Sequence, residues 1–89
     1  MEESNSVEVR VIFFAKSREL CGITESKINV PSRTTGQILL EKIVAYFPCL
    51  SVIRDNLLLS VNQEYLEQDS SVILKGGEEI AIIPPISGG

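Results

Sequence analysis

The strongest constraint on the fold is a pair of strand patterns at opposite ends of a short chain. Residues 7–13, VEVRVIF, place apolar side chains at every second position, which is the period of a half-buried β-strand. Residues 79–83, EIAII, form a second strand pattern that is almost wholly apolar. A chain of 89 residues can bury one modest core but not two. We therefore expect both strands to lie side by side in the middle of one sheet.

One strong helix pattern lies between these strands. Thr34, with Gln37 three residues later, matches a capping box at a helix start. Apolar side chains then recur at helical spacing, at Leu39, Leu40, Ile43, Val44 and Phe47. Pro48 cannot continue a helix, so the pattern predicts a helix over about residues 35–47.

The remaining segments predict short strands joined by loops and turns. A loop over residues 15–22 leads to a strand over residues 25–30, which ends at Pro31 and pairs antiparallel with the first strand. Residues 48–56 form a connector with room for a short helical turn. Further strand patterns precede the Gly76–Gly77 turn, at residues 57–61, 65–66 and 71–74.

This order of elements predicts the α+β class, with one main helix on one face of a mixed sheet. A right-handed crossover through the helix would place a later strand parallel to the first. We expect a disordered N-terminus at residues 1–6, one domain at residues 7–84 and a flexible tail at residues 85–89.

The composition excludes several classes of function. Without histidine the chain lacks the commonest general base and metal ligand, and we expect no metal site and no bound cofactor. No glycine-rich loop with a lysine resembles a nucleotide cradle. Glu78 and Glu79 are better explained as a solvated strand start than as a catalytic carboxylate pair. Cys21 and Cys49 stand alone in the sequence, and we expect them to be reduced, partly buried and chemically idle.

The charge pattern also limits the partners. The net charge is −4 without any basic run, so nucleic acid is not an expected partner. The apolar runs are too short to span a bilayer, and we expect no membrane association. The first residues, MEESNS, are acidic and polar rather than signal-like, which favours the cytosol.

The last strand offers apolar groups to both faces of the sheet. Ile80 and Ile82 should face the helix. Ala81 and Ile83 should share the other face with Ile12 and Phe14. This second face is either covered by a loop or hairpin of the same chain, or it docks a partner. We favour docking, because the chain has little spare length for a cover.

The segment after the last strand, PPISGG, has the properties of a projecting arm. Pro84 and Pro85 end the strand pairing and prefer an extended conformation. Gly88 and Gly89 can enter a channel where a Cβ atom would collide. The reactive group would be the α-carboxylate of Gly89, which needs activation, for example as an acyl-adenylate, by ATP chemistry on another protein. Attack by an amine would then give ubiquitin-like conjugation, and attack by sulfide or a persulfide would give a thiocarboxylate.

Three stretches resemble a known family. VIFFAKSREL at residues 11–20 followed by Gly22, VNQEY at residues 61–65, and GGEEIAIIPPISGG at the end resemble the small, sulfur-carrier subunits of molybdopterin synthase, over about residues 7–89. The resemblance implies a β-grasp, ubiquitin-like fold. It also implies that an E1-like enzyme uses ATP to adenylate the terminal glycine, which then becomes a thiocarboxylate. The tail would deliver sulfur to cyclic pyranopterin monophosphate in the active site of the large subunit, within a heterotetramer of two small and two large subunits.

Carried onto this chain, the resemblance makes Gly89 the bearer of the adenylate and then of the thiocarboxylate. The tail that enters the partner would comprise Pro84, Pro85, Ile86, Ser87 and Gly88. The partner docking patch would comprise Phe14, Ile12, Ala81 and Ile83. Two other hypotheses remain: a thiamine-pathway or ubiquitin-related carrier or protein modifier, and an inert interaction domain with a frayed tail.

Overall fold

A computed structural model describes residues 5–83 and contains seven strands, two α-helices and one 3₁₀ helix within that range. In chain order these elements are β1 (Ser6–Phe13), α1 (Ala15–Cys21), β2 (Glu25–Pro31), β3 (Arg33–Thr35), α2 (Gly36–Tyr46), the 3₁₀ helix η1 (Pro48–Asn56), β4 (Leu58–Val61), β5 (Glu64–Leu66), β6 (Ser71–Ile73) and β7 (Glu79–Ile83). β1 begins one residue before the expected domain start, and Asn5 already accepts a hydrogen bond from the Ser32 N–H.

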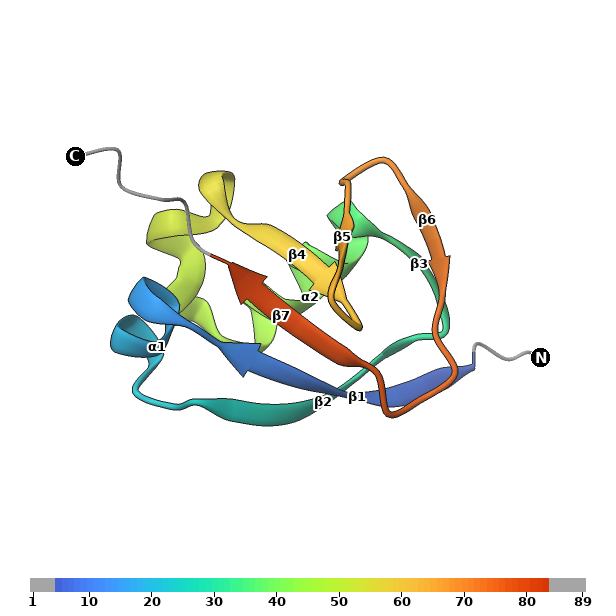
Figure 1. The fold of residues 1–89 in the computed structure, drawn as a ribbon, viewed down its shortest axis with the longest axis horizontal. Helices are drawn as coiled ribbons and strands as arrows, with labels where there is room; N and C mark the ends of the chain where they lie inside the picture. Colours follow the sequence, from blue (N-terminus) through green and yellow to red (C-terminus); the bar gives the residue numbers. More distant parts are fainter. Residues whose placement is uncertain (1–4, 84–89) are drawn as a thin grey trace.

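Five strands form the main sheet in the order β2-β1-β7-β4-β5 (Figure 1). The last strand, β7, lies in the middle, parallel to β1 and antiparallel to β4. The hairpin of β1 and β2 is antiparallel, as its sequence predicts. The predicted central position of the last strand beside the first is therefore confirmed, and the later strand that lies parallel to the first is β7. β3 and β6 form a separate two-stranded sheet that the sequence patterns did not distinguish.

The core lies between one face of the main sheet and α2, which crosses behind the sheet in Figure 1. β1 and β7 contribute alternate side chains, and α2 contributes one apolar stripe; the buried set from these elements is Val9, Val11, Phe13, Ile80, Ile82, Leu39, Leu40 and Ile43. Burying each of these larger side chains contributes about 1.5–3 kcal/mol. The predicted face assignment of β1 and β7 is confirmed.

The start of α2 differs by one residue from the predicted capping box. Thr35, not Thr34, is the N-cap, and its side chain accepts a hydrogen bond from the Ile38 N–H at 3.2 Å. Thr34 is buried in β3, and the Gln37 side chain donates to Glu41 instead of returning to the cap. The predicted Thr34–Gln37 box is therefore wrong. Two adjacent threonines offer the same chemistry, and only the burial of one in β3 decides between them.

The predicted loop at residues 15–22 contains the helix α1. Phe14 is the N-cap of this helix, and Gly22 is its C-cap. Gly22 adopts a left-handed φ of 71° and donates its N–H to the Arg18 carbonyl at 2.8 Å. Seven residues are too few for a helix to be stable alone, and the segment has no clear helical apolar period. The predicted connector at residues 48–56 forms η1. No helix within residues 5–83 combines the length and the apolar character needed to cross a membrane.

Cys21 and Cys49 are joined by a disulfide, with their Cα atoms 5.6 Å apart. Both are half-buried beside the core, as expected, but the prediction that they are reduced is wrong for this structure. The two residues are 28 positions apart, so their sequence spacing carries no sign of their proximity. The fold brings the end of α1 against the start of η1 and so creates the pair.

Gly36 provides a stability prediction. A Cβ at this position would lie 2.8 Å from the Glu67 carbonyl carbon and 2.9 Å from the Gln68 Cα, and the backbone there is held by the bonds from Gly36 N–H to Ser70 O and from Gln37 N–H to Gln68 O. We expect Gly36→Ala to lower the free energy of unfolding by about 2–3 kcal/mol, because the backbone of residues 67–68 must move to make room for the methyl group.

Chemical denaturation of this variant beside Gly22→Ala checks the prediction. Nothing lies within 4 Å of a Cβ at Gly22, so that variant should cost only the left-handed strain, about 1 kcal/mol. An unchanged stability for Gly36→Ala would show that the segment at residues 67–68 yields easily.

Candidate docking surface

The face of the main sheet opposite α2 is assembled from cross-strand neighbours. Ile12 on β1 pairs with Ala81 on β7, and Ala81 pairs with Ser60 on β4. Ser60 in turn pairs with Tyr65 on β5. Because paired residues point to the same face of a sheet, these four side chains form one row across it.

All four residues of the predicted docking patch, Ile12, Phe14, Ala81 and Ile83, line one open hollow of about 500 Å³. Ser60, Gln63, Tyr65 and Glu79 complete its lining. The structure thus brings together residues from both ends of the sequence, as the strand pairing requires. We keep the name docking patch for Ile12, Phe14, Ala81 and Ile83; that a partner binds them stays a prediction.

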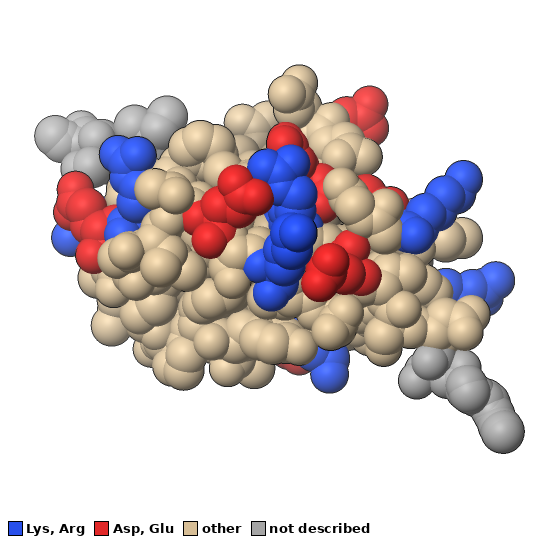
Figure 2. Space-filling view, turned by 90° about the horizontal axis from the view of Figure 1, so that it is seen from below, with Lys and Arg blue, Asp and Glu red and all other residues tan. Residues whose placement is uncertain are grey.

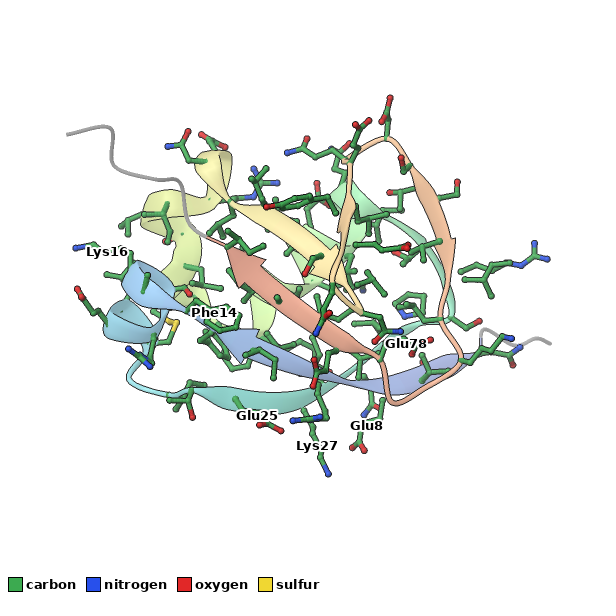
Figure 3. The ribbon with its side chains drawn as sticks, in the orientation of Figure 1. Glu8, Phe14, Lys16, Glu25, Lys27 and Glu78 are labelled. Carbon is green, nitrogen blue, oxygen red and sulfur yellow. A yellow bond between two sulfur atoms is a disulfide. The ribbon has the colours of Figure 1, made fainter. Side chains whose placement is uncertain are left out.

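Phe13 and Phe14 divide the two faces between them. The Phe13 ring is buried and meets Phe47 edge to face, with the ring centroids 5.0 Å apart. Phe14, by contrast, is 48% exposed at the point where β1 passes into α1 (Figure 3). The buried aromatic anchors the strand end, and the next residue offers its ring to the open face.

The backbone of Phe14 is bound by the first turn of α1. Its N–H donates to Ser17 Oγ at 3.0 Å, and the Ser17 hydroxyl donates to the Phe14 carbonyl at 2.6 Å. The Ser17 N–H donates to the same carbonyl at 3.1 Å. Ser17 is fully buried, so water does not reach its hydroxyl to compete for these bonds. They fix the direction in which Phe14 leaves the sheet.

Sequence reasoning missed two exposed apolar residues on this face. Leu58, which is 53% exposed, pairs with Ile83 and extends the apolar surface onto β4. Tyr65 is 72% exposed on the far side of the hollow. The pattern of residues 57–61 indicates a strand, but it does not show which strand lies beside β7. Only that neighbour relation could have identified both residues.

Charged groups border the docking patch on the side of β2. Arg10 on β1 makes ion pairs with Glu25 at 2.7 Å and with Glu79 at 3.1 Å. The hydrogen bond and charge of Arg10 lower the pKa of Glu25, and the same bond raises the pKa of Arg10. Figure 2, seen from the β2 side, shows basic side chains lying between acidic ones. Exposed pairs of this kind add little stability, but they give the apolar patch a polar border.

Glu78 and Glu79 have separate structural roles, which agrees with the strand-start interpretation. Glu79 begins β7 and pairs with Arg10. Glu78 accepts hydrogen bonds from the N–H groups of Lys75 and Gly76, at 2.7 and 2.8 Å. Burial opposes ionisation of Glu78, but these backbone bonds outweigh it and hold its pKa below the usual 4.5. Its carboxylate therefore closes the turn before β7.

This geometry predicts an acid-sensitive contribution to stability. A carboxylate whose pKa is lower in the folded state than in the unfolded state stabilises the fold at pH values above its unfolded pKa. This contribution is lost as the pH falls through the pKa of the folded state. We expect Glu78→Gln to lose less stability than wild type between pH about 6 and pH about 3, because glutamine does not titrate. Thermal unfolding over that range measures it, and parallel profiles would contradict the prediction.

The predicted tail residues, Pro84, Pro85, Ile86, Ser87, Gly88 and Gly89, lie outside the described residues. The last described residue, Ile83, belongs to the docking patch and ends β7 at the end of the molecule that carries α1 (Figure 1). Within residues 5–83 no group of three or more Cys, Asp or Glu side chains is placed to hold a metal ion.

Comparisons with known proteins agree over nearly the whole chain. The ThiS family model matches residues 11–89. A molybdopterin synthase sulfur carrier subunit of Drosophila erecta is 50% identical over 84 residues, covering 93% of this chain and 92% of that protein. The corresponding subunit of Arabidopsis thaliana is 41% identical over 88 residues, covering 99% of this chain and 90% of that protein.

Solved structures show the same fold. A putative molybdopterin converting factor subunit 1 from Pyrococcus furiosus has a TM-score of 0.72 at 27% identity, covering 90% of this chain and 99% of that chain. A chain in the complex of subunits 1 and 2 of the molybdopterin-converting factor from Helicobacter pylori has a TM-score of 0.66 at 20% identity. The match covers 93% of this chain and 100% of that chain. A Caldiarchaeum subterraneum ubiquitin has a TM-score of 0.64 at 13% identity, and the match covers 96% of this chain and 100% of that chain.

The predicted β-grasp, ubiquitin-like fold is thereby confirmed. The extent of the sequence match, rather than the fold alone, decides the family, since ubiquitin shares the fold at much lower identity. This chain belongs to the ThiS family and, within it, to the molybdopterin synthase sulfur carrier subunits.

Proposed function

We propose that this chain carries sulfur on Gly89 for molybdopterin synthase in the cytosol. The observation that carries the proposal is the 50% identity to a sulfur carrier subunit across 93% of the chain. The sequence match to the ThiS family also extends through residue 89, so it includes the Gly88–Gly89 pair. The chain is then a sulfur-donating, non-catalytic subunit of a sulfurtransferase complex.

Activation must come first, because a carboxylate is a poor electrophile. The Gly89 carboxylate attacks the α-phosphate of ATP on an E1-like enzyme, pyrophosphate leaves, and an acyl-adenylate forms. Sulfide attacks the acyl carbon, releases AMP and leaves a thiocarboxylate on Gly89 directly. When the donor is a persulfide, its outer sulfur forms an acyl disulfide as AMP leaves, and a second thiol then cleaves the S–S bond, which gives the thiocarboxylate and a new disulfide on the donor side. The ATP site belongs to the activating enzyme.

Sulfur transfer follows in the large subunit. Each thiocarboxylate sulfur bonds to a carbon of cyclic pyranopterin monophosphate as a carbon–oxygen bond at that carbon breaks. Water then hydrolyses the resulting thioester, which returns the Gly89 carboxylate and leaves the sulfur on the product as a thiolate. A dithiolene holds two sulfur atoms, so each product needs two loaded carriers. Proximity accounts for much of the rate, because the tail holds the sulfur beside its target.

The docking patch gives this transfer its partner surface. Ile83 belongs to the patch and is followed directly by Pro84, the first residue of the tail, so a partner that binds the patch is close to the start of the tail. The related chain from Helicobacter pylori is found in a complex of subunits 1 and 2. For this chain we propose a heterotetramer of two small and two large subunits.

The test combines mass spectrometry with a sulfur-transfer assay. The native chain should end at Gly89 and gain, after reaction with the E1-like enzyme, ATP and a sulfur donor, the mass of one oxygen replaced by sulfur. That form, mixed with the large subunit, should convert cyclic pyranopterin monophosphate. Conjugation of Gly89 to lysine amines without any thiocarboxylate would instead identify a protein modifier and overturn the proposal.

A further inference from the structure

The disulfide between Cys21 and Cys49 joins two short helical segments. Cys21 is the last residue of α1, and Cys49 is the second residue of η1; the bond appears in yellow in Figure 3. Seven residues of α1 cannot form a stable helix alone. Within α1 only Ser17 is fully buried. The bond to η1 is therefore a main attachment of α1 to the rest of the fold.

The first turn of α1 connects this bond to the docking patch. Ser17 exchanges hydrogen bonds with the backbone of Phe14, which is the N-cap of α1. Ala15 between them has a positive φ of 51°, a conformation that costs about 1–2 kcal/mol outside glycine. The local backbone preference therefore opposes this helix start, and the ordered helix has to maintain it.

We infer that Cys21 and Cys49 form a thiol–disulfide switch that controls the order of α1 and, through Ser17, the position of Phe14. Its effect on partner binding rests on the proposed function; its effect on α1 does not. In the disulfide state α1 is attached to η1 and Phe14 is held for docking. In the dithiol state α1 loses that attachment, and its first turn opens more often.

The chemistry needs only a small disulfide such as oxidised glutathione. One cysteine thiolate attacks that disulfide and releases one small thiol; the second cysteine then attacks the mixed disulfide and releases the other. Two protein thiols are oxidised, and one small disulfide is reduced to two thiols. Both cysteines are half-buried rather than sealed in the core, so a small reagent can reach them. In reducing compartments, disulfides of mesophilic proteins are mostly transient or redox-sensing.

Amide hydrogen exchange of the full-length chain tests the switch directly. Samples are equilibrated in oxidised or reduced glutathione, and alkylation with mass spectrometry counts the free thiols. We expect amides of residues 17–22 to exchange at least about tenfold faster after reduction, while those in the centre of β1 and β7 change little. Equal exchange at residues 17–22 in both states, or no disulfide in oxidised glutathione, would overturn the inference.

Variants separate the bond from its consequence. Cys21→Ser and Cys49→Ser should each show the fast exchange of the reduced form in both glutathione mixtures. The double variant Cys21→Ser/Cys49→Ser has no thiol left to form a mixed disulfide, so it should not respond to glutathione at all. Ser17→Ala keeps the disulfide but removes the side-chain link to Phe14, and should weaken binding of the large subunit as reduction does, by about tenfold. If Ser17→Ala and the reduced chain both bind like the oxidised wild type, the link to Phe14 is refuted.

Failure of the proposed function would look different. If neither redox form of the wild type binds the large subunit, the proposed partner is wrong, while the exchange measurement still decides whether the cysteines control α1.

Discussion

Deletion of Gly89 is expected to abolish sulfur transfer while the fold stays intact. The deletion moves the terminal carboxylate to Gly88, about 3.5 Å short of the point where the partner enzymes act. A misplacement of even 1 Å can lower a rate about 100-fold, so no turnover above background should remain. Steady-state conversion of cyclic pyranopterin monophosphate with the large subunit measures the effect.

Two further variants show whether the position of the terminal acyl group or the lack of a side chain at Gly88 is what matters. One residue added after Gly89 should be as inactive, because the acyl group then lies one residue too far along. Gly88→Val should keep the wild-type unfolding temperature, yet block adenylation or entry into the partner, because a β-branched side chain replaces a bare backbone. Full turnover by the deleted or extended chain, with its mass verified, would refute the sulfur-carrier proposal.

A charge in the docking patch should weaken binding of the large subunit by about 2–4 kcal/mol, which is the range for a buried interface hot spot. Phe14→Asp is the most informative change, because the ring is 48% exposed in the free chain and its loss leaves the core intact. Ile83→Asp should act in the same direction. Binding titrations measure the loss, and thermal unfolding of the free variants shows whether the fold is preserved.

Ile73→Asp is the matched control. Ile73 is also an exposed apolar residue, but it lies on β6 and lines a different hollow. We expect this variant to bind like wild type. If Phe14→Asp and Ile83→Asp unfold the free chain, both residues belong to the core; if Ile73→Asp weakens binding equally, the partner surface is not the docking patch.

Much of the fold was predictable because its main signals are local. The two-residue period of residues 7–13 and the helical period before Pro48 each follow from side chains that are close in sequence. A single small core then leaves few ways to combine them. The central position of the last strand follows from its apolar residues on both faces, and it brought Ile12 and Phe14 together with Ala81 and Ile83.

The candidate site was predictable only as far as strand pairing was. Residues on β1 and β7 could be placed on one face because the two strands were expected to be neighbours. Leu58 and Tyr65 were missed, since nothing in the local pattern tells which strands flank β7 on its other side. The choice between Thr34 and Thr35 as helix cap likewise depended on the tertiary structure, which buries Thr34 and leaves the Thr35 side chain to accept the Ile38 N–H.

The sequence by itself determined the alternation of β1, the main helix to within one residue at each end, and the Gly88–Gly89 pair, because these depend on neighbouring residues. The tertiary structure alone decided the helix α1 and the pairing of Cys21 with Cys49. Seven residues do not make a stable helix in isolation, so α1 exists through its contacts with the rest of the fold. Two cysteines 28 positions apart become partners only when α1 and η1 pack together.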